Sequence, residues 1–343
     1  MKYVGIDSVE PGQQLGKTIY TSNGNILLAA GVQLTVYMIS TLNRIGVTML
    51  YIEDELYADI DTEDILSDST KRALFNEMHD TFEAMRSGKE WGTKRLSVSV
   101  NKILDDVLTN KELLVQLTDI RTQDNDAYVH AMNVCQIATL IGMNMGLNAI
   151  QLKDLATGAL LHDVGKALME SPNEDKRNSK QHHTWLGFEH LKNKREFNLM
   201  IAHIALQHHE HMDGTGIPRK LLSDEIHLYA KIVAVANTYD NLINPLHPNG
   251  GLMPHLACEK LMAMSDVELD HEVLVQFNRI ISVYPNGTAV RLSTKETGII
   301  VRQHRGLPAR PVVRIVQTNQ QDYTISELDL AEQTTVFIEG VLS

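Results

Sequence analysis

The chain has 343 residues, of which 43% are hydrophobic and 22% charged, a balance typical of a folded globular protein with a sizeable core. This length predicts one large domain with appended modules, or two to three smaller units, and excludes a single small scaffold. The net charge of −12 argues against a nucleic acid polymer or an anionic membrane as partner, because no global field would attract a polyanion. A small anionic ligand stays compatible, since a local metal cluster can outweigh the net charge.

The cysteines and the hydropathy pattern indicate the compartment. Cys135 and Cys258 each lie in an apolar helical pattern, which indicates buried thiols in a reducing compartment and not a disulfide framework. The first residues form no apolar signal segment, and no stretch approaches the roughly 18 uncharged apolar residues of a membrane span. We therefore expect a cytoplasmic protein without membrane contact.

Residues 1–60 are strand-like and rich in turns, which predicts a small β-containing module. The turn sequence at residues 22–25 predicts a hairpin between strands at 17–20 and 26–29. Apolar residues at helical spacing between Leu34 and Ile45 predict a helix, followed by a strand over 48–52. An acidic run then leads into a segment that we interpret as a helical linker, residues 61–95.

The rest of the chain changes pattern once. Residues 96–284 have almost wholly helical periodicity, which predicts an all-helical domain. After the Pro285-Asn286-Gly287 turn, apolar and polar residues alternate in short runs, which predicts a C-terminal β extension over 285–343. The predicted fold class is mainly α, with a small β-containing module before the helical domain and a short β extension after it.

Histidine is the most informative residue type in this sequence. Nine of the fifteen histidines fall between residues 130 and 211, where an even distribution would place between three and four. A single histidine is usually a surface or core residue, but a cluster of this density indicates a metal site.

The segment 160–166 places an imidazole, a carboxylate and an amine on one apolar helix. The adjacent His162 and Asp163 can serve two neighbouring metals if the carboxylate bridges them, and Lys166 returns to the same face one turn later. A solvated His-Asp pair at a helix end is the simpler alternative, but the apolar neighbours weaken it.

A second cluster, residues 207–218, ends a helix in imidazoles and then turns sharply. The adjacent His208 and His209 point in different directions, which suits ligands on two metals, or one metal and one structural partner. Two acidic residues could orient the imidazoles or hold the loop, while glycines and a proline shape its exit. These loop candidates are Glu210, Asp213, Gly214, Gly216, Ile217 and Pro218.

Two further sets of candidate site residues are weak evidence alone and matter only because the two clusters above indicate a metal site. Asp126 and His130 are spaced i, i+4 and share a helix face, although a surface pair would have the same spacing. His183 precedes Gly187 in a short helical stretch.

These motifs resemble, in order and approximate spacing, those of the HD-GYP family of metal-dependent phosphohydrolases. The resemblance covers roughly residues 95–290, and the combination of HDxGK with HHE and DGxGxP is specific. The first fifty residues are also similar to the small N-terminal module of some members.

The resemblance implies a helical domain that holds two or three divalent ions, iron or manganese, and hydrolyses cyclic di-GMP to pGpG or GMP by a metal-bridged hydroxide. It implies catalytic roles for Asp163 and for Lys166, which would stabilise the phosphate charge or assist proton transfer. The implied metal ligands are His130, His162, Asp163, His183, His208 and His209, with Asp126 at the position of a carboxylate in trinuclear members.

Three positions depart from the family pattern. Ile217 replaces the tyrosine of GYP, and Asn237 replaces the last aspartate ligand, with Asp240 one turn later as a candidate alternative ligand. The basic segment that follows this helix in many members is residues 244–249 here, with no Arg or Lys.

Two other functions stay open. Asn237 and the missing basic segment suit a non-catalytic sensor of cyclic dinucleotides or a partner-binding protein, and an HD hydrolase of another nucleotide is a third possibility. A homodimer through the apolar helix near residues 97–117 is also open, because a helix packed on a core has the same apolar stripe.

Overall fold

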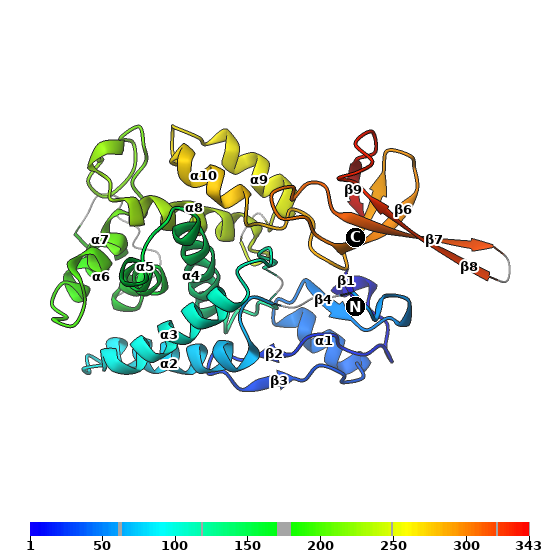
Figure 1. The fold of residues 1–343 in the computed structure, drawn as a ribbon. Helices are drawn as coiled ribbons and strands as arrows, with labels where there is room; N and C mark the ends of the chain where they lie inside the picture. Colours follow the sequence, from blue (N-terminus) through cyan, green and yellow to red (C-terminus); the bar gives the residue numbers. More distant parts are fainter. Residues whose placement is uncertain (61–63, 118, 170–179, 248–249, 320–321, 343) are drawn as a thin grey trace.

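The computed structural model describes residues 1–60, 64–117, 119–169, 180–247, 250–319 and 322–342. Helices dominate the described residues, and short strands occupy both ends of the chain (Figure 1), so the predicted fold class is confirmed. The helices are α1 (Val36–Arg44), α2 (Asp68–Arg86), α3 (Thr93–Thr109), α4 (Asp126–Asn144), α5 (Ala149–Leu161), α6 (His183–Leu191), α7 (Leu199–Gln207), α8 (Leu228–Ile243), α9 (Pro254–Ala263) and α10 (His271–Asn278).

The N-terminal module contains two antiparallel strand pairs and one helix. Strand β1 (Lys2–Gly5) pairs with β4 (Met49–Ile52), and β2 (Ile19–Tyr20) pairs with β3 (Ile26–Leu28). The turn between β2 and β3 closes through Thr21 N, which donates to Asn25 O (2.9 Å), and uses Gly24 at φ +70°. Helix α1 begins after Thr35, whose side chain accepts a hydrogen bond from Met38 N. The predicted hairpin, helix and strand are therefore confirmed.

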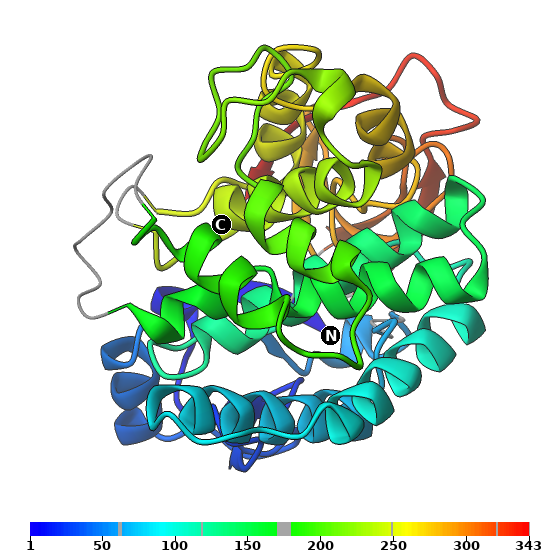
Figure 2. The same cartoon turned by 90° about the vertical axis from the view of Figure 1, so that its left-hand side faces the viewer.

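Helix α4 is the centre of the helical region. Every residue from Tyr128 to Gly142 is buried, so α4 is covered by other parts of the chain on all its faces. Helices α5 and α8 pack directly against it, while α2 and α3 lie along one side of the bundle (Figure 2). No described helix is long and apolar enough to cross a membrane.

Helix α2 is a packed layer of the helical region. Its residues Leu74, Phe75 and Met78 are buried in the same apolar cluster as the side chains of α4. The segment interpreted as a helical linker thus contains α2, whose buried apolar residues pack against the core of the helical region.

The C-terminal strands form one antiparallel sheet in the order β8-β7-β6-β5-β9. Its strands are β5 (Ala289–Leu292), β6 (Thr297–Arg302), β7 (Val312–Asn319), β8 (Asp322–Asp329) and β9 (Ile338–Leu342). The β7–β8 hairpin projects away from the body (Figure 1). The sheet contacts the N-terminal module, where Tyr51 Oη donates to Asn286 O (3.0 Å) and Arg314 pairs with Asp59 (2.6 Å).

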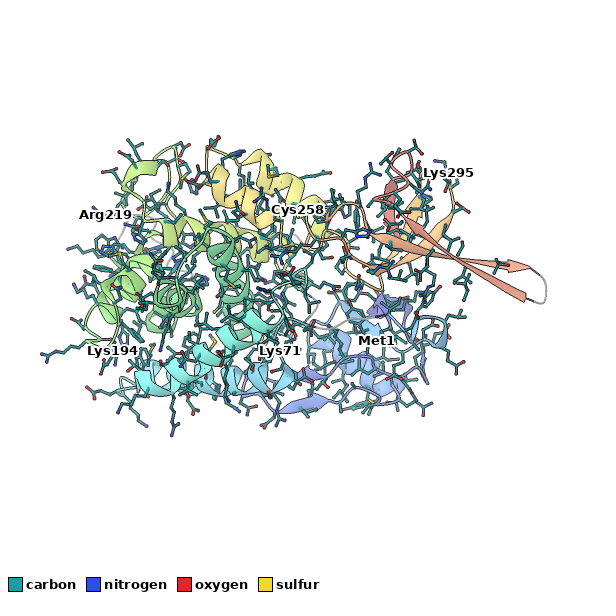
Figure 3. All side chains as sticks on the ribbon, in the orientation of Figure 1. Met1, Lys71, Lys194, Arg219, Cys258 and Lys295 are labelled. Carbon is teal, nitrogen blue, oxygen red and sulfur yellow. The ribbon has the colours of Figure 1, made fainter. Side chains whose placement is uncertain are left out.

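A buried ion network joins the N-terminal module to α2. Lys71, labelled in Figure 3, is 2% exposed, and its Nζ lies 2.8 Å from Asp64 Oδ2 and 2.6 Å from Asp119 Oδ1. Lys17 of the N-terminal module binds the other oxygen of Asp64 (2.7 Å). Burial alone would lower the pKa of Lys71, but Asp119 and Asp64 outweigh burial and hold that pKa above its usual value. Lys71 therefore stays charged.

We expect Lys71→Met to lower the free energy of unfolding by about 2–3 kcal/mol, because it removes the cation of Asp119 and leaves Asp64 with Lys17 alone. Urea denaturation measures the loss. The matched control is Arg86→Met, whose ion pair with Glu83 is solvent-exposed and should be worth less than about 1 kcal/mol. Equal losses in the two variants would contradict a structural role for the buried network.

Candidate metal centre

The HD pair lies where α5 ends. Helix α5 runs to Leu161, and His162 is its fully buried C-cap residue. His162 Nδ1 donates to Ala159 O (2.8 Å), and its Nε2 faces Asp163 and His130. The ring orientation is thus fixed by the backbone of α5.

Asp163 stands between two sets of imidazoles. Its Oδ2 lies 3.4 Å from His162 Nε2 and 3.5 Å from His130 Nε2. Its Oδ1 lies 3.3 Å from His183 Nε2 and 3.6 Å from His208 Nε2. One carboxylate therefore presents a different oxygen to each set.

We name these sets by their members. The first donor group is His130, His162 and Asp163, and the second donor group is Asp163, His183, His208 and His209. Within each group, the candidate ligand atoms lie within 4.8 Å of one another. The structure thus gathers the six residues for which the sequence implied ligand roles in a binuclear site.

The donor groups fit divalent cations. Asp163 Oδ1 and His208 Nε2 are buried without a hydrogen-bond partner among the described residues, whereas buried polar atoms are normally paired. Two Nε2···Nε2 distances, His130–His162 and His183–His209, are 3.2 Å. Metal–nitrogen bonds of about 2.1 Å place neighbouring donors roughly 3.0–3.4 Å apart, so this spacing suits a shared ion.

The second donor group has the protonation states that a metal requires. Burial lowers the pKa of His183 to about 2 and that of His208 to about 4, and it holds the pKa of His209 well below its usual value. These imidazoles are therefore neutral at neutral pH. Metal ligands must be neutral imidazoles or ionised carboxylates, so no proton has to leave these rings.

Hydrogen bonds and nearby charges determine the pKa values of Asp163 and His130. Burial raises the pKa of Asp163, but Lys166 and His162 outweigh burial and hold it well below its usual value. Burial likewise lowers the pKa of His130, but hydrogen bonds to Asp163 and Asp240 raise it to about 9. A cation that binds the first donor group must therefore displace a proton from His130.

Lys166 lies at the exposed edge of the centre. Its ammonium pairs with Asp163, and its side chain is 57% exposed. A cation that is both close to the shared carboxylate and accessible to solvent can reach a bound phosphate.

The loop after His209 is held by its backbone. Glu210 is buried, and its carboxylate accepts hydrogen bonds from Arg219 N (2.7 Å) and Leu221 N (3.0 Å). Ile217 N donates to His209 O (2.9 Å), so the residue that replaces the family tyrosine ties the loop to a candidate ligand through its main chain. Glu210 therefore holds the loop, as one of its two predicted roles.

The glycines and Asp213 shape the same loop. A Cβ on Gly216 would lie 2.2 Å from His211 N, and Gly214 has φ +77°, so larger residues would displace the turn. Asp213 is exposed and accepts hydrogen bonds from the backbone N–H and the hydroxyl of Thr215 (2.9 and 2.7 Å). The turn ends at the half-buried Pro218.

Asp126 and Asp240 lie outside both donor groups. The Asp126 carboxylate accepts hydrogen bonds from Arg121 (2.9 Å) and Asn244 (3.0 Å). Asp240 is fully buried, and its Oδ2 accepts a hydrogen bond from His130 Nδ1 (2.6 Å). Asp240 thus contacts the far nitrogen of a candidate ligand.

Asn237 and the segment after α8 use their polar groups locally. The buried Asn237 accepts a hydrogen bond from Asn241 Nδ2 (2.9 Å), one turn along its own helix. In the segment 244–249, which the sequence singled out for its lack of Arg and Lys, Asn244 Oδ1 accepts from Leu246 N (2.9 Å). Residues 248 and 249 lie outside the described residues.

Sequence reasoning missed two residues beside the centre. Arg121 and Asn133 both donate to Asp240 Oδ1, Asn133 at 2.8 Å. Asn133 is three residues after His130 on α4, and that spacing was a usable signal. Arg121 belongs to no motif, and it meets Asp240 across 119 positions of sequence.

We expect Gly165→Ala to damage the centre, because a Cβ there would lie 1.9 Å from the backbone oxygen of His183. The clash is with main chain, so α6 must move, and the variant should lose about 2 kcal/mol of stability and part of its bound metal. Urea denaturation and metal analysis measure the two losses. In the control Gly340→Ala, the new Cβ meets no atom within 4 Å, and both quantities should be unchanged.

Comparisons with known proteins match two parts of the chain to known families. The family described as HD domain matches residues 80–273, and the family described as KOW domain associated with HD domain matches residues 289–343. A solved HDG"Y"P protein from Bdellovibrio bacteriovorus superposes with a TM-score of 0.52 at 19% identity, covering 80% of this chain and 97% of that one, which supports the fold.

Curated relatives match over part of their length. A cyclic di-GMP phosphodiesterase of Pseudomonas aeruginosa is 27% identical over 242 residues, 68% of this chain and 58% of the relative. The cyclic di-GMP phosphodiesterase response regulator RpfG of Xanthomonas campestris is 30% identical over 160 residues (44% and 42%), and a 3'3'-cGAMP-specific phosphodiesterase of Vibrio cholerae is 27% identical over 154 residues (42% and 30%). The matches thus span less than two thirds of each relative. Because the HD domain match takes in more than half of the chain, this protein belongs to the HD domain family, as its resemblance to the HD-GYP members implied.

Proposed function

We propose that this protein is a metal-dependent phosphodiesterase of cyclic dinucleotides, with cyclic di-GMP as the substrate and pGpG as the first product. The observation that carries the proposal is Asp163, whose two carboxylate oxygens face two separate groups of imidazoles. A carboxylate shared in this way suits two cations a few ångströms apart, the arrangement of binuclear phosphoesterases.

The donor groups define which residues would hold each ion. The first donor group offers one ion three ligands, and the second donor group offers another ion four, with Asp163 common to both. Five imidazoles and one carboxylate favour transition metals over Mg²⁺ or Ca²⁺, which agrees with the iron or manganese implied by the family resemblance.

The ions and the side chains have separate tasks in the proposed reaction. Two bound divalent ions supply a nucleophile at neutral pH and neutralise the charge that develops on the phosphate. Asp163 would contribute a ligand to each ion, and the half-exposed Lys166 beside it could contact a phosphate oxygen. Ile217 N holds the carbonyl of His209 and so keeps this ligand in place while substrate binds.

The relatives that this chain matches support the proposed substrate class. Two of those described above are named for cyclic di-GMP and one for 3'3'-cGAMP, so a cyclic dinucleotide is their common substrate class. Residues 244–249 contain no Arg or Lys, so among the described residues we assign Lys166, together with the metal centre, to the negative charge of the phosphates.

The principal test is anaerobic purification, followed by metal analysis and chromatography of products from cyclic di-GMP and from 3'3'-cGAMP. We expect metal-dependent formation of pGpG, with cyclic di-GMP turned over faster. Tight binding of cyclic di-GMP by the metal-loaded protein without product would support the alternative of a non-catalytic sensor, which Asn237 in place of a carboxylate ligand favours.

Asp163→Asn should reduce metal content from about two ions per chain to well below one and abolish hydrolysis, because both donor groups lose their only negative ligand. His162→Ala should remove about one ion, since only the first donor group contains it. His271→Ala, a change to an exposed histidine on α10, is the matched control and should retain metal and activity. Metal analysis after identical dialysis decides among these outcomes.

Asp126→Asn tests the number of ions. The resemblance implied a ligand to a third ion, but the Asp126 carboxylate is bound to Arg121 and Asn244, so we propose a centre of two ions. Metal content should then be unchanged in this variant. A loss of about one ion per chain would instead assign Asp126 to a third site.

A further inference from the structure

His130 differs from two other candidate ligands in what lies behind its ring. His162 Nδ1 donates to Ala159 O (2.8 Å), and His208 Nδ1 lies 2.9 Å from Ala205 O. In both rings Nδ1 therefore contacts a neutral backbone carbonyl. His130 Nδ1 instead donates to the carboxylate of Asp240 (2.6 Å). A carboxylate behind a ligating imidazole orients the ring and increases its basicity, and therefore its affinity for a cation.

Arg121 holds Asp240 in this position. Asp240 is fully buried and Arg121 is 6% exposed, so neither charge is solvated, and each stabilises the other. The Asp240 oxygen that faces away from His130 accepts hydrogen bonds from Arg121 and from Asn133 (2.8 Å). With both oxygens engaged, the carboxylate cannot rotate toward the centre without breaking a buried ion pair.

The backbone next to Arg121 is anchored to the N-terminal module. In the connector before α4, residues 119–125, Gln123 N donates to Ile45 O (3.1 Å), and Asn125 Nδ2 donates to Tyr20 O (2.8 Å). The guanidinium also binds Asp126 (2.9 Å). Arg121 is thus fixed from the module on one side and from the first turn of α4 on the other.

The two donor groups do not depend equally on this arrangement. The first donor group has three members, so an ion there relies on each ligand more than an ion held by the four members of the second donor group. His130 belongs only to the first donor group. A change in the orientation or basicity of His130 should therefore affect one ion and spare the other.

We propose that Asp240 and Arg121 are positioning residues that set the affinity of the first donor group for its ion, acting through His130, and leave the second donor group unaffected. The inference rests on the proposed two-ion centre. It assigns Asp240 a place behind a ligand in contrast to the direct ligation that the sequence left open.

The test is a metal titration of the metal-free, full-length protein with Mn²⁺, in which equilibrium dialysis measures ions per chain against free Mn²⁺. We expect two binding steps in the unchanged protein. In Asp240→Asn, the weaker step should move to about 10–100-fold higher Mn²⁺, while the tighter step stays in place. A purely structural loss would weaken both steps together.

A double variant separates the expected effect from misfolding caused by an unpaired buried charge. Asp240→Asn leaves Arg121 buried with only Asp126 as its counter-charge, so Asp240→Asn combined with Arg121→Gln removes both charges together. Because Arg121 acts through Asp240, the double variant should shift the weaker step no further than Asp240→Asn alone. Asp270→Asn, which removes a part-buried partner of Lys231, is the matched control and should shift neither step.

The outcomes separate this inference from the proposed function. If the unchanged protein binds two ions and the Asp240 variants bind both with unchanged affinity, or lose both alike, the positioning role is wrong. If the unchanged protein binds fewer than two ions, the two-ion centre itself is wrong. Loss of the weaker step alone, equal in the single and double variants, supports the inference.

Discussion

The shared carboxylate of Asp163 is the constraint on which the rest of the structure depends. Its oxygens must meet imidazoles that come from α4, the end of α5, the start of α6 and the end of α7, so four helices have to converge on one side chain. Gly165 permits the closest of these approaches, because α6 passes where a Cβ would stand. The apolar faces of the helices supply the driving force for this convergence, while the buried donor atoms oppose it until a cation satisfies them.

Buried charge outside the centre follows one rule, in which each cation has two carboxylate partners. Lys71 lies between Asp64 and Asp119, and Arg121 lies between Asp126 and Asp240. Asp119 and Arg121 are two residues apart in the connector before α4. Asp119 belongs to the Lys71 network beside the N-terminal module, and Arg121 belongs to the network beside the metal centre. The module is therefore part of the structure that positions the metal ligands, and its removal would expose both networks to water.

Local patterns predicted the elements well, because hairpin turns and helical periodicity depend on neighbours in sequence. The same reasoning singled out four of the six donor residues, since HDxGK and HHE each place two of them side by side in sequence, whereas the ligand roles of His130 and His183 came from the family resemblance. It could not place Asp126, because i, i+4 spacing fixes the face that two residues share but not what that face meets. There the face meets Arg121, whose other partner, Asp240, is 119 positions away, and pairing at such distance leaves no local periodicity.

Because Asn237 is neutral, the metal centre has few negative ligands to balance the charge of its ions. With its amide oxygen engaged by Asn241, Asp163 is the only anionic member of the two donor groups, so two bound divalent ions would leave a local charge of about +3. Lys166 adds to this charge at the exposed edge. A protein of net charge −12 could in this way attract the anionic substrate that we propose for it, because the positive field would be concentrated at the metal centre. An ion in the first donor group would have one ligand fewer than an ion in the second, so the buried carboxylate behind His130 would have its largest effect on that ion.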